Sequence, residues 1–223
     1  MTTIGQHIEP REIENQSFAI IESEVPEPRP FQGKEWQVVR RMIHTTADFE
    51  LLSLVRFHPG GVRKGIEALH RGCLIVTDTE MARMGITSRR MDRLGCRVEC
   101  YMDDPEVKEK ALREETTRAS AAVDFALHRL DGTIYVVGNA PTALLWLLEW
   151  VGKGKCKPAL IVGIPVGFVN AAESKDLLIE QTGIPYITIK GRKGGSALAA
   201  CVVNQLAEIA LESRNVEEIG NRE

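Results

Sequence analysis

The residues with the clearest chemical potential lie in the segment RRMIHTTADF, from Arg40 to Phe49. His44 follows Arg40 by four residues and Arg41 by three, so on a helix the three side chains share one face. An anionic ligand bound by the two arginines would help the imidazole hold a proton, and this suits a proton donor that acts on an acidic ligand. The same residues also fit a surface histidine in a basic helical patch.

Four elements are expected to position this segment, because of their hydrophobic periodicity and their proline and glycine boundaries. They are a helix over Glu9–Glu24, a helix over Lys34–Thr45, a strand over Leu51–Phe57 and a short helix over Val62–His70. The three apolar residues of the second helix fall at helical spacing and predict its buried stripe: Trp36, Val39 and Ile43. We expect the strand at the edge of a sheet.

The rest of the chain alternates short β-branched runs with helical stretches, which indicates a parallel sheet covered on both faces. The predicted strands are Cys73–Thr77, Cys96–Met102, Thr133–Val137, Ala159–Val162 and Tyr186–Ile189. The predicted helices are Thr79–Leu94, Asp104–Leu130 with a possible break at 115–117, Pro141–Val151, Ala171–Gln181 and Ser196–Leu211. The sequence therefore predicts one α/β domain over residues 1–223. It is a three-layer α/β/α core of five parallel strands over 73–211, with N-terminal helices and an edge strand in 1–60.

The bulk composition is that of an ordinary soluble enzyme or binding protein. Of 223 residues, 26% are charged and 43% hydrophobic, with a net charge of −3. No excess of positive charge predicts nucleic-acid or membrane binding. The first residues lack the apolar region of a secretory signal, and no apolar run is long enough to span a membrane, so we expect a cytoplasmic location.

Cysteine and histidine usage offers no metal site. The five cysteines are odd in number and show no CxxC spacing, which argues against a disulfide framework or a zinc site. The five histidines are scattered along the chain. We therefore expect a protein with reduced cysteines and without a bound metal.

The loops that follow the predicted strands carry the residues most suited to ligand binding, because parallel sheets bind ligands beyond their carboxyl ends. Helix capping accounts for glycine and serine in such loops, but it does not account for the neighbouring Arg192 and Lys193. With Arg118 and Lys175, these residues suit a polyanionic small molecule that bears several carboxylates. No phosphate-binding or dinucleotide fingerprint and no G-x-S-x-G elbow occurs, so a flavin or nucleotide module of flavodoxin-like fold is the weaker interpretation.

The chain resembles the family of precorrin-8X methylmutase and cobalt-precorrin-8 methylmutase, of cobalamin biosynthesis. The segments that carry the resemblance are Ser17-Phe18, MIHTTADF (42–49), TDTEM (77–81), TRASAAVD (117–124), GNAPTAL (138–144), VGIPVGFVNAAESK (162–175) and GRKGGS (191–196). They extend over nearly the whole chain in this order, which makes the resemblance specific.

The resemblance implies an isomerase that moves a methyl group from C-11 to C-12 of a tetrapyrrole ring by a [1,5]-sigmatropic shift. The product would be hydrogenobyrinic acid, or cobyrinic acid when cobalt is present, and no cofactor is consumed. It also implies a flavodoxin-like fold and a homodimer. The histidine of the HTTAD motif, His44, would be catalytic, and Ser17 and Arg41 would contact the substrate.

Further residues are expected to bind the substrate because they stand in these motifs or at the strand ends. They are Thr45, Asp78, Thr79, Met81, Arg118, Asn139, Ala140, Thr142, Glu173, Ser174, Lys175, Arg192, Lys193, Gly194, Gly195 and Ser196. The roles of Asp78, Asn139, Thr142 and Glu173 stay open between ligand contact and turn capping. A carrier that binds the acidic tetrapyrrole without converting it is the alternative. The sequence does not say whether the substrate holds cobalt.

Overall fold

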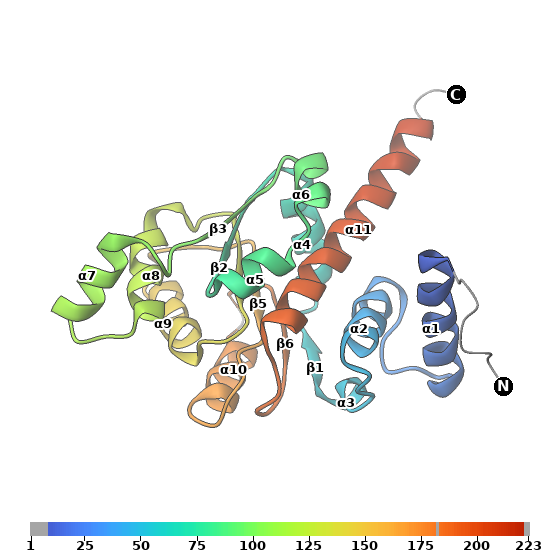
Figure 1. Cartoon of the computed structure of the whole chain (residues 1–223), viewed down its shortest axis with the longest axis horizontal. Coiled ribbons are helices and arrows are strands. Elements are labelled where there is room, and N and C mark those ends of the chain that lie inside the picture. Colours follow the sequence, from blue (N-terminus) through green and yellow to red (C-terminus); the bar gives the residue numbers. More distant parts are fainter. Residues whose placement is uncertain (1–8, 182, 221–223) are drawn as a thin grey trace.

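A six-stranded sheet forms the middle of the computed structural model, which describes residues 9–181 and 183–220 (Figure 1). Its strands are β1 Val55–Phe57, β2 Leu74–Thr77, β3 Arg97–Cys100, β4 Ile134–Val137, β5 Leu160–Gly163 and β6 Tyr186–Ile189. The spatial order is β1-β6-β5-β4-β2-β3. Strands β2 to β6 run parallel, and β1 pairs antiparallel with β6 at the edge. The predicted five parallel strands and edge strand are confirmed.

The strand order is that of flavodoxin-like folds. When the five parallel strands are numbered along the chain, their order is 2-1-3-4-5, so the direction of progression reverses between β2 and β4. Such a switch point opens a crevice outside the carboxyl ends of the two strands. A ligand-binding site is therefore expected at this edge of the sheet.

Helices cover both faces of the sheet, which makes the predicted three layers. One face is covered by α2 Gly33–Thr46, α4 Gly61–His70, α5 Glu80–Gly85, α6 Ser88–Leu94 and α11 Ser196–Gly220. The other face is covered by α7 Pro105–Arg113, α8 Arg118–Ala126, the short 3-10 helix Leu127–Arg129, α9 Pro141–Gly152 and α10 Ala171–Glu180. In Figure 1 α11 runs diagonally across its face of the sheet and extends beyond it.

Successive side chains along each strand point to opposite faces of the sheet and pack into two separate hydrophobic cores. On β4, Ile134 and Val136 join the core under α11, whereas Tyr135 and Val137 join the core under α8 and α9. All four side chains are buried, because β4 lies inside the sheet with a helical layer on each side. A continuous apolar run in the sequence thus corresponds to a strand buried on both faces.

Several element boundaries differ from the sequence prediction. The expected strand over Leu51–Phe57 begins as a short helix, α3 Leu51–Leu54, and only its last three residues are β1. The expected helix over Thr79–Leu94 is two helices, because Asn204 of α11 accepts from Thr87 N at 2.9 Å and donates to Gly85 O at 2.8 Å at the break between them. A contact this distant in sequence leaves no local signal.

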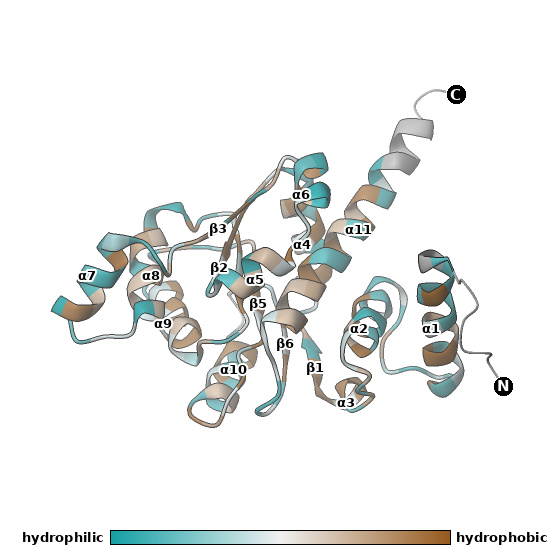
Figure 2. Ribbon diagram, viewed as in Figure 1, coloured by the Kyte–Doolittle hydropathy of each residue, from teal (hydrophilic) through white to brown (hydrophobic). Residues whose placement is uncertain are grey.

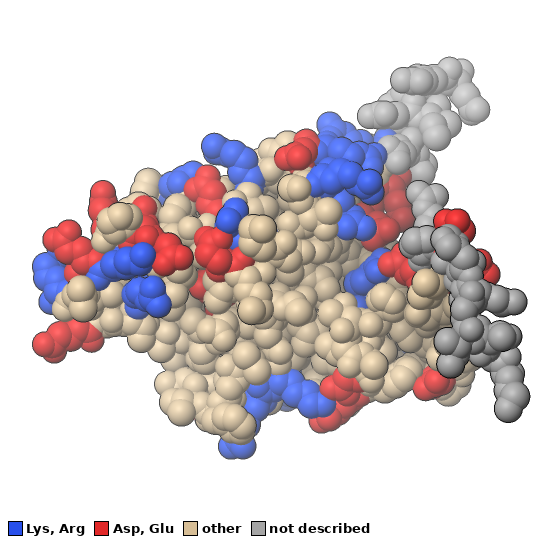
Figure 3. Space-filling view, in the orientation of Figure 1, with Lys and Arg blue, Asp and Glu red and all other residues tan. Residues whose placement is uncertain are grey.

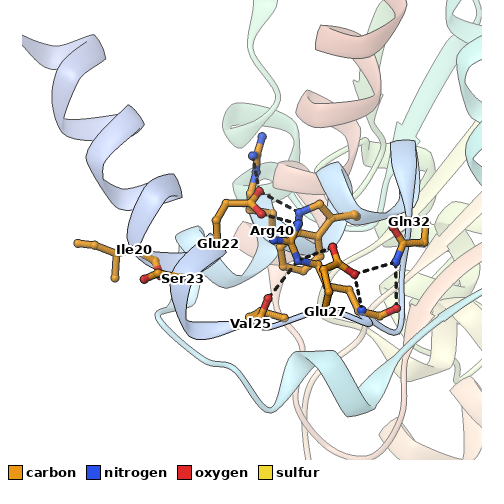
Figure 4. Close-up of polar contacts among 9 residues, drawn as sticks. Ile20, Glu22, Ser23, Val25, Glu27, Gln32 and Arg40 are labelled. Atoms are coloured by element: carbon orange, nitrogen blue, oxygen red, sulfur yellow. Dashed lines mark hydrogen bonds and ion pairs between the residues drawn. The ribbon is translucent and has the colours of Figure 1, made fainter.

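The N-terminal helix α1, Pro10–Glu24, packs against α2 at the outer side of the domain, at the right of Figure 1. It carries both hydrophobic and hydrophilic bands (Figure 2). Glu22 near its end accepts hydrogen bonds from Trp36 Nε1 at 3.0 Å and Arg40 Nη1 at 2.7 Å, and Figure 4 shows this network around the connector to α2. Among the described residues, no helix is long and apolar enough to cross a membrane.

Candidate functional site

His44 lies in the last turn of α2, beside the outer helix α1. Ala47 ends α2 in the left-handed conformation at φ 51°, and the chain then turns toward α3. The ring of Phe18, from α1, packs against the imidazole with 5.2 Å between ring centroids. The guanidinium carbons of Arg40 and Arg41 lie 4.3 and 4.8 Å from the centroid of the same phenyl ring. The predicted shared face is confirmed, but α1 covers it.

Both arginines of this face bind carboxylates of their own chain. Arg41 donates to Glu14 of α1 and reaches Gln205 and Glu208 of α11 at 2.9 and 3.3 Å. The hydrogen bond from Arg41 is the main reason that the pKa of Glu14 lies below its usual value. Arg40 pairs with Glu22. Carboxylates from α1 and α11 therefore pair with both arginines of this face.

The two hydroxyl groups expected at this site are bonded within their helices. Ser17 Oγ donates to the carbonyl of Ile13 at 2.8 Å, and Thr45 Oγ1 donates to that of Arg41 at 2.8 Å. Each oxygen keeps its lone pairs for a further contact. Ser17 directly precedes Phe18 on α1, but only Phe18 makes a contact with α2 among the interactions of the described residues. The sequence motif placed Phe18 next to Ser17 but predicted no role for it. An aromatic ring beside a basic helical face is the signal that would have found this role.

Asp78 closes the crevice at the switch point. Its carboxylate follows β2 and accepts the backbone N–H groups of Gly138, Asn139 and Ala140 at 2.8, 2.8 and 2.7 Å. Burial raises the pKa of Asp78, and these three N–H groups act against that rise. In a nucleotide-binding protein such N–H groups would hold a phosphate. Here a side chain takes that place, which is a physical reason to disfavour a flavin or nucleotide module.

The start of α11 packs into the loops that follow β2 and β4. Thr79 caps α5 by accepting from Ala82 N at 3.1 Å, and its hydroxyl lies 2.9 Å from that of Ser196. A Cβ on Gly138 would stand 2.6 Å from the α-carbon of Ser196, so only glycine permits this approach. The side chain of Met81 is largely exposed on α5. Thr79 and Ser196 are thus brought together, with Met81 beside them on the surface.

The residues expected after β4 lie at the beginnings of α8 and α9. Thr142 accepts a hydrogen bond from Thr117 Oγ1 at 3.1 Å, which joins the two helix starts. Asn139 is exposed, and Ala140 is partly buried. Arg118 is more than half exposed, and among the described residues the one acid near its guanidinium is Asp103, at 3.8 Å. Arg118 is therefore a cation that a ligand could reach without displacing a strong ion pair.

Lys175 holds two loops together and does not reach the surface. Its Nζ donates to the carbonyl of Pro165 at 3.0 Å and to that of Lys193 at 2.6 Å, and its side chain is fully buried. Burial lowers the pKa of Lys175 to about 8. The expectation that it holds a substrate carboxylate finds no support in this geometry. Its neighbours on α10 differ: Glu173 is exposed, and buried Ser174 donates to the Ala171 carbonyl at 3.2 Å.

The loop over residues 191–195 approaches the backbone of the loop after β5. A Cβ on Gly194 would lie 2.4 Å from the carbonyl oxygen of Ile164, and Gly195 adopts φ 130°. Lys193 Nζ contacts Asp48 at 2.5 Å and Glu50 at 2.6 Å, which raises the pKa of Lys193. Arg192 is exposed, with its guanidinium 5.6 Å from the Phe168 ring, and it has no carboxylate partner in residues 9–181 and 183–220.

The surface between these cations is mostly uncharged. Figure 3 shows uncharged residues across the middle of the view, where Figure 1 places the start of α11. The large exposed apolar side chains near the strand ends are Met81, Met84, Val166, Phe168 and Val169. An apolar surface with cations at its margin fits a flat molecule with anionic side arms. Within the described part of the chain, no three His, Cys, Asp or Glu side chains gather as a metal site.

Comparisons with known proteins agree with this geometry. The model of the precorrin-8X methylmutase family matches residues 12–209. The cobalt-precorrin-8 methylmutase of Leptospira interrogans is 44% identical over 203 residues, which cover 88% of this chain and 92% of that protein. The precorrin-8X methylmutase of Pseudomonas aeruginosa is 41% identical, over 87% and 93%. A crystal structure of precorrin-8X methylmutase from Thermus thermophilus superposes with a TM-score of 0.85 at 44% identity, over 91% and 97% of the two chains.

Proposed function

The chain belongs to the precorrin-8X methylmutase family, and from this premise we propose that His44 drives a methyl shift on a tetrapyrrole ring. As a methylmutase it is an isomerase of cobalamin biosynthesis that acts on precorrin-8X or cobalt-precorrin-8. The methyl group moves from C-11 to C-12 in a [1,5]-sigmatropic shift. The rearrangement takes place within one molecule, so catalysis can rest on a fixed pose and one well-placed proton.

The position of His44 is the observation that carries this mechanism. The imidazole is partly exposed and fixed by Phe18, and within the described residues its nitrogens have no hydrogen-bond partner. A protonated imidazole can therefore donate to a ring nitrogen of the substrate. Protonation makes the conjugated ring electron-poor and lowers the barrier for the migrating methyl group. Departure of the proton afterwards restores the neutral ring.

Cations around the uncharged surface would hold the carboxylate side arms. Arg192 and Arg118 are the first candidates, because they are exposed and bound weakly or not at all by carboxylates of the chain. Arg41 is a second candidate, provided that a substrate carboxylate replaces Glu14 as its partner. The exposed side chains of Met81 and Phe168 would contact the apolar ring.

A homodimer is part of this proposal. Ile13 and Ile20 stand seven residues apart on α1, so they lie on one face of the helix, and 52% and 56% of their surfaces are exposed. This exposed apolar face lies on the other side of α1 from Phe18, and it supports an interface along the outer side of the helix that contacts His44. Light scattering after size exclusion tests it: twice the chain mass is expected, and an Ile13→Lys/Ile20→Lys variant should elute as a monomer. A parent protein of single-chain mass would refute the dimer.

The test of function compares the parent protein with His44→Ala on metal-free precorrin-8X, with the ring spectrum followed over time and the methyl position read by NMR. Conversion by the parent and binding without conversion by the variant are expected. His128→Ala is the matched control, because His128 is exposed and lies far along the chain in the turn after α8. It should convert like the parent. If the parent binds but converts neither this substrate nor its cobalt complex, the protein is a carrier.

A further inference from the structure

Two carboxylates of the segment after α2 converge on one lysine of the loop after β6. Lys193 Nζ lies 2.5 Å from Asp48 Oδ2 and 2.6 Å from Glu50 Oε2. Asp48 stands only four residues after His44, at the point where α2 has just ended. The contact therefore joins the helix end that carries the imidazole to a loop that comes more than 140 residues later.

The backbone that carries Lys193 is fixed independently of this contact. The Lys193 carbonyl accepts from buried Lys175 Nζ at 2.6 Å, and Gly195 N donates to Ile164 O at 3.0 Å. Between them, Gly194 packs directly on the carbonyl oxygens of Ile164 and Pro165. The backbone of Lys193 is thus held in place by contacts that do not involve its side chain. The lysine can therefore fix the positions of the two acids.

The contact is expected to contribute little to the free energy of folding, which leaves a role in ligand binding. The side chains of Lys193, Asp48 and Glu50 are 45%, 30% and 58% exposed. Exposed ion pairs stabilise proteins weakly, because solvent screens them and ordering the side chains costs entropy. Their charges still act on a nearby ligand. Without Lys193, two negative charges would stand beside the site of a substrate that is itself polyanionic.

We propose that Lys193 determines specificity for the polycarboxylate substrate through Asp48 and Glu50, by neutralising both acids and holding them away from the substrate. It does not itself bind a substrate carboxylate. Its neighbour Arg192, which has no acid partner in the described chain, is the residue of this loop left free for that contact. The inference rests on the proposed function, since it needs an anionic ligand beside His44.

The test measures the Kd of precorrin-8X by titration of its absorbance, with four variants in the His44→Ala background so that no conversion intervenes. At low ionic strength, Lys193→Met should weaken binding roughly tenfold, because two uncompensated charges then face the ligand. The Asp48→Asn/Glu50→Gln/Lys193→Met variant should bind within about twofold of the reference, since the repulsion is gone. Asp48→Asn/Glu50→Gln should bind at least as tightly as the reference.

A triple variant that binds as poorly as Lys193→Met would overturn the inference, because it would show that the lysine itself holds the ligand. Lys193→Met binding that equals the reference would do the same. Lys153→Met is the matched control: it removes one exposed lysine paired with Glu149 on α9 and should leave the Kd unchanged. Binding needs no turnover, so the series decides the inference even if the parent proves to be a carrier.

Discussion

The phenyl ring of Phe18 packs against the imidazole of His44, with ring centroids 5.2 Å apart and the planes tilted by 57°. The two residues come from separate helices, and Arg40 and Arg41 place their guanidiniums over the same phenyl ring. Helix α1 therefore belongs to the candidate site, because Phe18 contacts the group proposed to donate the proton.

Phe18→Ala is expected to lower kcat/KM at least tenfold, since the imidazole loses the surface that orients it. Phe31→Ala is the matched control, because Phe31 packs on Phe57 in the same N-terminal part of the chain and lies away from His44. Steady-state kinetics of both variants, with thermal unfolding to correct for stability, make the comparison. Equal losses in both would show that Phe18 only supports the fold.

The ion pair between Glu14 of α1 and Arg41 of α2 should contribute less to the unfolding free energy at acidic pH. The hydrogen bond from Arg41 keeps the pKa of Glu14 below its unfolded value of 4.5, so its contribution to stability is present above pH 4.5 and is lost as pH falls through the lowered pKa. We expect the unfolding free energies of the parent and Glu14→Gln to differ by up to about 1 kcal/mol at pH 7 and to converge as pH falls through the lowered pKa. Denaturant titrations measure this.

Glu24→Gln is the control for that series, because Glu24 is exposed on the same helix. Its difference from the parent gives the baseline at each pH for removing an exposed acid from α1. A constant difference for Glu14→Gln relative to this baseline would contradict the assigned ion pair with Arg41.

Asp78→Ala should destabilise the protein by about 3 kcal/mol or more, because three backbone N–H groups lose a charged acceptor at a buried turn. Asp131→Ala should cost only about 1 kcal/mol, since that carboxylate accepts one N–H, from Lys157, in an exposed turn. Urea unfolding of both variants gives the two values. Similar costs for the two would mean that the Asp78 carboxylate does not hold the turn after β4.

Lys175 should make stability rise with pH on the alkaline side. Burial lowers its pKa to about 8 from 10.5, so between these values the unfolded chain holds a proton that the folded chain has lost, and the unfolding free energy increases. In the parent protein, a pKa of Lys175 lowered from 10.5 to about 8 corresponds to a rise of about 3 kcal/mol in the unfolding free energy. Unfolding of Lys175→Met from pH 7 to 11 should lack it. Lys155→Met, at an exposed lysine, should retain it.

Local patterns predicted much of the fold, and the reasons are visible in particular elements. The run TIYVV predicted β4 because a strand buried on both faces needs apolar side chains in succession. The stripe of Trp36, Val39 and Ile43 predicted the buried face of α2, and all three side chains are buried. The break before α8 was expected at 115–117 and lies between Arg113 and Arg118. The break between α5 and α6 was missed, because Asn204 holds it from another helix.

The amino-acid sequence by itself determined the α/β class, the parallel strands, the family and the place of His44 beside two arginines, because hydrophobic period, helical spacing and motif order are local properties. Only the tertiary structure decided what each charge does. Arg41 binds Glu14 and Glu208, Lys175 is buried between two carbonyls, and Lys193 holds Asp48 and Glu50. A charged side chain reaches partners far away in sequence, and its burial depends on packing of the whole chain, so its role becomes readable only in the fold.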